Sequence, residues 1–329
     1  MQATPAKKPG HARPKTAAPA AAADIHFQKL FVTTDFSDAA LAGVRCDVAL
    51  SKQLGLDATL LHVVEPPTRL GGMEAVALAR TEAEVAALAR KQLAALAGRE
   101  RVSGVRLTAS VRTGKPVHEI TAAAGEGGAD LLVMATLGRT GWQRALLGST
   151  AERVVRHAPC PVLTVPSGAG DTGAGKVRPF QLQKLVVPVD FSRLAQAALP
   201  WATFLAAQFG AELVLLNVVE KFPIDYLLGQ EQTADTLARL RTQAAAELEP
   251  LAADLVKATG LKVSVVVRDG TPYTEICQAA ETLGADLIVL TTHGYTGLQQ
   301  VWLGSTAERV VRHASCPVLT VRELNQKNV

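Results

Sequence analysis

One stretch of the sequence occurs twice and begins with residues suited to binding an anion. It covers residues 148–165 and 304–321, and the copies differ only where Pro159 is replaced by Ser315. Each copy opens with Gly-Ser-Thr and continues in a pattern typical of a helix. The first backbone N–H groups of a helix lack partners within it, and glycine lets a phosphate approach the backbone closely. The residues predicted to form an anion site in this way are Gly148, Ser149, Thr150, Gly304, Ser305 and Thr306.

A loop that carries another glycine precedes each copy. Nine residues separate Gly138 from Gly148, and nine separate Gly294 from Gly304. Glycine at both ends of a loop of fixed length permits a close approach of the backbone to a phosphate. We therefore add Gly138 and Gly294 to the predicted anion sites.

The elements that position these loops follow from the hydrophobic pattern. Short runs rich in β-branched residues alternate with helical stretches, and the scheme repeats at an offset of about 156 residues. Such alternation predicts an α/β fold with a doubly wound parallel sheet and right-handed crossovers. In the first copy we expect strands over 30–34, 58–64, 105–111, 131–135 and 162–165, and helices near 39–54, 74–97, 117–126 and 150–157.

Further candidate residues lie where the expected strands end. In doubly wound sheets, ligands bind beyond the carboxyl ends of the strands. An aspartate there could accept hydrogen bonds from ribose hydroxyls, and a strand-end backbone could bond the edge of an adenine. Together with the helix start, these features predict a mononucleotide site in each half. The strand-end residues are Asp35, Val64 and Gly114 in the first copy and Asp190, Val219 and Gly270 in the second.

The Gly-Ser start also permits a purely structural interpretation. Ser149-x-x-Glu152 and Ser305-x-x-Glu308 have the pattern of a capping box, in which the serine caps its own helix. The glycines would then serve tight turns alone. Both interpretations remain open from the residues themselves.

Composition restricts the function classes. The chain has 329 residues, 48% of them hydrophobic, and a formal net charge of +4. Four cations in the first 23 residues, Lys7, Lys8, Arg13 and Lys15, account for that charge, so the body is neutral, which argues against nucleic-acid binding. No apolar run is long enough to span a membrane. Four cysteines without a Cys-x-x-Cys pair favour a reducing, cytoplasmic location.

Taken together, these motifs resemble the universal stress protein family. The resemblance rests on the strand-Asp-x-Ser start, Gly-x-Pro after the third expected strand, Ala-Asp-Leu-[Leu/Ile]-Val, and Gly-Ser-Thr-Ala-Glu-Arg-Val-Val-Arg-His-Ala-x-Cys-Pro-Val. It covers nearly everything from Lys29 to Val321, in two tandem copies. The resemblance implies two tandem doubly wound five-stranded parallel-sheet domains, each with strand order 3-2-1-4-5.

The resemblance also implies a ligand. ATP-binding members of the family carry Gly-x2-Gly-x9-Gly-[Ser/Thr], and both copies match it except at the first glycine, which is Ala135 or Thr291 here. The expected ligand is thus ATP, with Mg²⁺ able to accompany it. The resemblance further implies that Asp35 and Asp190 contact ribose or adenine and that Val64 and Val219 lie beside the base.

The expected organisation is a tail over 1–26, which we expect to be disordered, domains over 27–166 and 182–323, a linker over 167–181 and a second tail over 324–329. The resemblance further implies that the two domains pair as an intramolecular pseudo-dimer through their last strands. A homo-oligomer and a signalling partner of unknown identity are left open.

The most favoured function is a nucleotide-binding stress-response regulator or sensor. The alternatives are a slow ATPase and a nucleotide-free structural or interaction protein. Arg139 and Arg144 could serve an ATPase, but the second copy has Tyr295 and Gln300 there. Two other patterns carry less weight: a P-loop-like run over 170–177 that lacks the Ser/Thr after its lysine, and a metal site built from His157, Cys160, His313 and Cys316.

Overall fold

The parallel strands predicted for each half form one continuous sheet. The computed structural model describes residues 25–66, 74–100, 104–136, 148–167, 181–192, 195–220, 230–291 and 304–322. In the first half the strand order is β3-β2-β1-β4-β5, and in the second it is β8-β7-β6-β9-β10. The predicted order 3-2-1-4-5 is therefore confirmed in both halves.

The central strands are buried, whereas the outer strands β3 and β8 are more exposed. Those of the first half are β1 (Leu30–Thr33), β2 (Ala58–Val64), β3 (Leu107–Thr113), β4 (Leu131–Ala135) and β5 (Val162–Val165). Those of the second half are β6 (Lys184–Pro188), β7 (Glu212–Glu220), β8 (Val263–Gly270), β9 (Leu287–Thr291) and β10 (Val318–Val321). Every residue of β4 and β5 is buried, as expected for strands covered on both faces. Strand β3 begins at Leu107, two residues later than predicted, and this residue pairs with Ala58, the first residue of β2.

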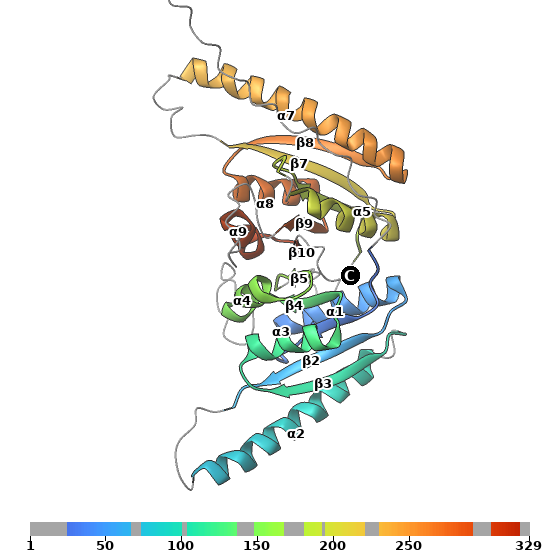
Figure 1. The fold of residues 1–329 in the computed structure, drawn as a ribbon, viewed down its shortest axis with the longest axis vertical. Coiled ribbons are helices and arrows are strands. Elements are labelled where there is room, and N and C mark those ends of the chain that lie inside the picture. The colour runs from blue at the N-terminus through green and yellow to red at the C-terminus, as the bar shows by residue number, and fades with distance from the viewer. Residues whose placement is uncertain are drawn as a thin grey trace, which may run out of the picture.

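Helices cover both faces of the sheet (Figure 1). The first-half helices are α1 (Asp38–Leu54), α2 (Glu74–Glu100), α3 (Pro116–Gly127) and α4 (Ser149–His157). In the second half, the 3-10 turn η3 (Ala195–Ala197) leads into α5 (Ala198–Phe209), followed by α7 (Gln230–Thr259), α8 (Pro272–Leu283) and α9 (Ser305–His313). One core joins α1, α2, α5 and α7 to one face of the sheet, and another joins α3, α4, α8 and α9 to the opposite face.

The halves meet along a seam with approximate twofold symmetry. Strands β5 and β10 pair antiparallel, with Leu163 opposite Leu319. Across them, the Thr164 hydroxyl donates to the Val318 carbonyl and the Thr320 hydroxyl to the Val162 carbonyl, each over 3.1 Å. The predicted pairing of the two halves through their last strands is confirmed.

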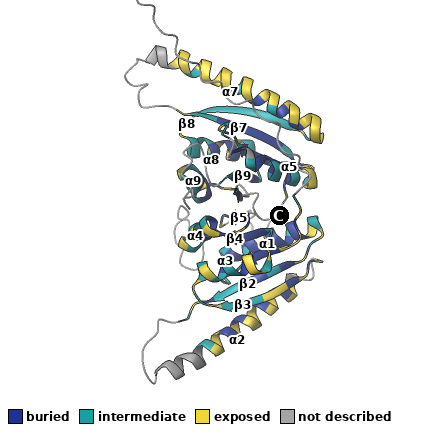
Figure 2. Ribbon diagram, in the orientation of Figure 1, coloured by how far each residue is buried: buried dark blue, intermediate teal, exposed yellow. Residues whose placement is uncertain are grey.

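The ends of the sheet lie far from this seam. Figure 2 shows that α2 and α7, at opposite ends, carry long exposed faces, whereas the central strands are buried. Among the described residues, no helix is long and apolar enough to cross a membrane.

Candidate functional site

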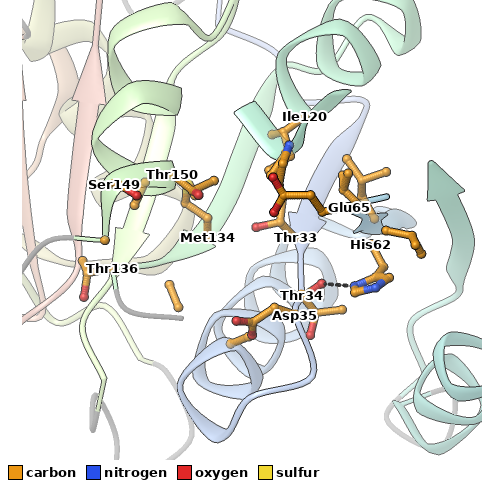
Figure 3. Close-up of a pocket in the computed structure, with 18 of the residues that line it drawn as sticks. Thr33, Thr34, Asp35, His62, Glu65, Ile120, Met134, Thr136, Ser149 and Thr150 are labelled. Atoms are coloured by element: carbon orange, nitrogen blue, oxygen red, sulfur yellow. Dashed lines mark hydrogen bonds between the residues drawn. The ribbon is translucent and has the colours of Figure 1, made fainter. Parts of the chain in front are cut away.

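A pocket in the first half lies at the predicted edge of the sheet. Its volume is about 450 Å³, and it is bounded by the carboxyl ends of β1, β2 and β4 and by the start of α4. In Figure 3, Ser149 and Thr150 lie on one side of the pocket, opposite His62. The predicted site residues on its wall are Asp35, Val64, Gly148, Ser149 and Thr150.

Helix α4 begins with its backbone directed at this pocket. Gly148 is the N-cap, and its own N–H donates to the Thr136 carbonyl over 2.7 Å. A Cβ at Gly148 would lie 3.1 Å from that carbonyl oxygen. A larger residue at position 148 would therefore crowd this carbonyl, so the fold itself favours glycine here, whether or not a ligand is bound.

The capping-box interpretation is wrong in both halves. The Glu152 N–H donates to the Gly148 carbonyl over 3.0 Å, and the Glu308 N–H donates likewise to the Gly304 carbonyl. The N-cap is thus the glycine, and the serine is the first residue of the helix. The Glu152 carboxylate does not reach back to the helix start, because it is paired with Arg156. Ser149 is left exposed at the mouth of the pocket.

Asp35 has a structural task as well as a place on the pocket wall. Its Oδ1 accepts from the Ser37 N–H over 3.0 Å and from the Ser37 hydroxyl over 2.5 Å, while Ser37 caps α1. The intervening Phe36 has a φ of 65°. In the second half, Asp190 Oδ1 accepts from the Ser192 N–H over 2.9 Å. The Asp-x-Ser motif therefore builds a tight turn that presents an aspartate at the end of the strand.

Gly114 is not among the residues that line the pocket, but it is bonded to one of them. Its N–H donates to the Val64 carbonyl over 3.0 Å, at the end of β2. Its φ is 153°, and a Cβ would lie 2.8 Å from Glu119. Glycine is needed here for the backbone, and the Val64 carbonyl already has a partner.

His62 lines the pocket and was not singled out from the sequence. Its Nδ1 lies 2.7 Å from the Thr34 carbonyl at the end of β1, and its ring is 4.4 Å from the Phe36 ring. Because a carbonyl only accepts, Nδ1 carries the proton in this bond. At the equivalent position, the Asn217 amide donates to the Val189 carbonyl over 2.7 Å. Comparison of the two copies could have found this pair, since both residues carry an N–H donor.

Further wall residues that were not predicted from the sequence include the hydroxyl-bearing or acidic Thr33, Thr34, Glu65 and Thr136. Their only signal was proximity to a strand end. No lysine or arginine occurs among the described residues that line this pocket. Backbone N–H groups and hydroxyls are thus what this wall offers to an anion.

The second half repeats the backbone frame. Asp190 follows β6, Val219 lies in β7, and Gly270 ends β8 with a φ of 149°. Gly304 is the N-cap of α9, whose first residues are Ser305 and Thr306. Gly138, Gly294, Arg139, Arg144, Tyr295, Gln300 and the P-loop-like run lie outside the described residues.

The cysteines and histidines considered as metal ligands have other surroundings. Burial raises the pKa of Cys160 and of Cys316 to about 12, so both remain thiols. The His313 ring lies 5.8 Å from the Tyr273 ring. Within the described ranges, no group of three or more His, Cys, Asp or Glu side chains could hold a metal ion.

Comparison with known proteins gives a consistent result. The model of the universal stress protein family matches residues 26–166 and again 181–322. A universal stress protein from Methanocaldococcus jannaschii is 35% identical over 141 residues, which are 43% of this chain and 82% of that protein. Another, from Mycobacterium tuberculosis, is 32% identical over 231 residues, 65% of this chain and 72% of that protein.

Solved structures show the same fold over most of the chain. The crystal structure of a universal stress protein from Archaeoglobus fulgidus covers 89% of this chain and 98% of its own, with 24% identity and a TM-score of 0.60. The family match spans both halves, and the strand order, the turn after β1 and the glycine-led α4 and α9 occur in each. The chain therefore belongs to the universal stress protein family, as a tandem member with two copies of the family's fold.

Proposed function

We propose that this protein binds an adenine nucleotide, ATP foremost, and acts as a cytoplasmic regulator or sensor in the stress response. The observation that supports this most strongly is the first-half pocket, which brings Asp35 and the end of β2 together with the start of α4. Its volume of about 450 Å³ falls within the range of small-molecule sites.

The chemistry of the wall suggests how a nucleotide would lie. The phosphates would meet the first N–H groups of α4 and the hydroxyls of Ser149 and Thr150, because this end of the helix favours negative charge. Asp35 would accept from the ribose hydroxyls, and the base would lie beside Val64 at the end of β2. Mg²⁺ would enter with the nucleotide and offset part of its phosphate charge.

Such a site suits binding more than turnover. Phosphoryl transfer needs a cation to neutralise developing charge and a group to position the attacking water. The described wall offers Asp35, Glu65 and His62 but no lysine or arginine. We propose that the nucleotide acts by stabilising the state that binds it, so that the population of that state follows the nucleotide level.

The test is equilibrium binding of ATP to protein from which copurified ligand has been removed. The unmodified chain is compared with Gly148→Val, whose side chain would crowd the Thr136 carbonyl and the start of α4. We expect binding by the unmodified chain and a loss of at least about tenfold in the variant. Gly304→Val, the same change in the second copy, is the matched control and should leave the first-half site intact.

The following results distinguish the proposed function from its alternatives. Absence of ATP binding by the unmodified chain would overturn the proposal. Phosphate release is measured in parallel, and a steady rate that disappears in Gly148→Val would favour the slow ATPase instead. Mass spectrometry of the ligand released from fresh protein identifies the nucleotide directly.

A further inference from the structure

Four charged side chains join α4 to α9 across the seam. Arg156 Nη2 lies 2.7 Å from Glu152 Oε1 within α4, and Arg312 Nη2 lies 2.9 Å from Glu308 Oε1 within α9. Each arginine also approaches the glutamate of the other helix, at 3.3 Å for Arg156 and Glu308 and at 3.8 Å for Arg312 and Glu152. These four side chains, which we call the α4–α9 ion-pair ring, are 22–32% exposed.

Glu152, one member of the ring, lies one helical turn along α4 from the proposed phosphate site. The Glu152 N–H donates to the carbonyl of Gly148, so one turn, about 5.4 Å along the axis, separates Glu152 from the helix start. A carboxylate this close would disfavour a bound anion unless a neighbouring cation offset its charge. Arg156 and Arg312 supply that offset, and Arg312 belongs to the other half.

The pocket makes this offset important. Its described wall contains the acids Asp35 and Glu65 and no lysine or arginine. An uncompensated Glu152 would therefore add a third negative charge near a site that is to hold phosphates. The partly buried position of the ring strengthens the effect, because such charges are screened less than those in open solvent.

We infer that Arg312, in the second half, is a positioning residue for the nucleotide site of the first half, and that Arg156 has the reciprocal role. The inference rests on the proposed function and names how that site is regulated. Arg312 does not touch the nucleotide: it acts through Glu152, whose charge it offsets and whose carboxylate it helps to hold at the seam. Neither nucleotide site is then electrostatically complete without the other half.

The test measures ATP affinity of the first-half site in the full chain. Gly304→Val serves as the parent, so that binding reports the first half. Adding Arg312→Gln is expected to raise Kd about three- to tenfold. The matched control is Arg309→Gln, which removes the same charge from the same helix. Arg309 is exposed and packs over the Tyr273 ring at 5.1 Å, so we expect a change of less than about twofold.

A second variant predicts the opposite sign. Glu152→Gln leaves the ring with a net positive charge and is expected to lower Kd, also about three- to tenfold. The double variant Glu152→Gln/Arg312→Gln should return Kd to near that of the parent, which a merely structural role of Arg312 would not produce. Thermal melts establish that each variant is folded, and Glu152→Gln alone decides the matter if Arg312→Gln does not fold.

The possible failures are distinguishable. If the unmodified chain binds no ATP, the proposed function fails and this inference with it. If the parent binds ATP but Arg312→Gln matches Arg309→Gln, or Glu152→Gln weakens binding, only the inference is overturned. If the unmodified chain binds and the Gly304→Val parent does not, the first half is not the binding half, and the inference is again overturned.

Discussion

The two halves share one backbone frame but differ on the wall of the proposed nucleotide site. The Asp-x-Ser turn, the glycine after the third strand and the glycine-led last helix occur in both. Around this frame, Thr33, Thr34, His62 and Ala135 of the first half correspond to Pro188, Val189, Asn217 and Thr291 of the second. The duplicated residues thus build turns, helix starts and the seam, whereas the diverged residues would decide what each half binds.

The halves also differ at one buried position of their first helices, α1 and α5. Asp47 in α1 is fully buried, and in the described structure neither of its carboxylate oxygens has a hydrogen-bond partner. The equivalent residue in α5 is the equally buried Ala202. One half therefore carries a buried acid where the other carries a small apolar side chain.

The largest expected effect comes from removing that acid. Burial raises the pKa of Asp47 from 3.8 to about 8. Between about pH 4 and 8 the unfolded chain releases this proton and the folded chain keeps it, so folding stability falls by roughly 1.4 kcal/mol per pH unit as an upper bound. Asp47→Ala should remove this loss and stabilise the protein more at pH 8 than at pH 4. Denaturant unfolding at several pH values measures it.

The reverse substitution provides the control. Ala202→Asp should impose the same kind of pH-dependent loss on α5, because it places a carboxyl group in an equivalent buried site. An unchanged slope of stability against pH in Asp47→Ala would show that the acid has a partner in solution.

The next prediction concerns one pair of packed residues: the first half combines a small helix residue with a large strand residue, and the second half does the reverse. A Cβ at Gly127, the last residue of α3, would clash with the Phe31 ring. The equivalent pair in the second half is Leu283 and Val186, which belong to the same apolar face. Gly127→Leu should therefore destabilise the protein by about 1–3 kcal/mol through overpacking, as measured by denaturant unfolding.

The second half supplies the compensating change. Adding Phe31→Val to Gly127→Leu reproduces the second-half pair, so the double variant should recover most of the lost stability. Additive losses in the two single variants would argue that the pairs are not interchangeable and that the halves differ in helix position as well.

A smaller effect is expected at the end of the fourth strand. Ala135 lines the first-half pocket, and its counterpart in the second half is the larger Thr291. Ala135→Thr should weaken ATP binding to the first half by roughly tenfold, because the extra atoms take space on the pocket wall. Thr291→Ala is the matched change and should leave the first-half affinity unaltered. Calorimetry of both variants gives affinity and stoichiometry, and equal effects would remove the distinction between the halves.

The sequence predicted the frame because the frame depends on short, local patterns. Buried β-branched runs and glycines at turns specify strands and crossovers, and the duplication supplied an internal check on each. The role of Ser149 was ambiguous, since a serine before a helical pattern can be the N-cap or the first helical residue. The structure resolves it through the bond from the Glu152 N–H to the Gly148 carbonyl.

Other features depended on tertiary contacts. Nothing in the sequence distinguishes Asp47 from an exposed helix acid, because its burial results from how α1 packs on the sheet. The α4–α9 ion-pair ring likewise depends on the seam, which brings Glu152 and Arg156 of the first half next to Glu308 and Arg312 of the second. Gly114 is predicted as a site residue from its place after a strand, but its bond to the Val64 carbonyl follows from the pairing of β2 with β3.

The smallest effect tests whether His62 is a feature of the frame or of the site. Both His62 and Asn217 hold the carbonyl at the end of the neighbouring strand over 2.7 Å. His62→Asn should therefore change stability by less than about 0.5 kcal/mol, whereas His62→Ala should lose about 1 kcal/mol with the hydrogen bond. Denaturant unfolding compares the two variants. If His62→Asn keeps stability but alters ATP affinity, the imidazole contributes to binding. If it alters neither, the histidine belongs to the shared frame, and the distinction between the halves rests on the threonines and Ala135.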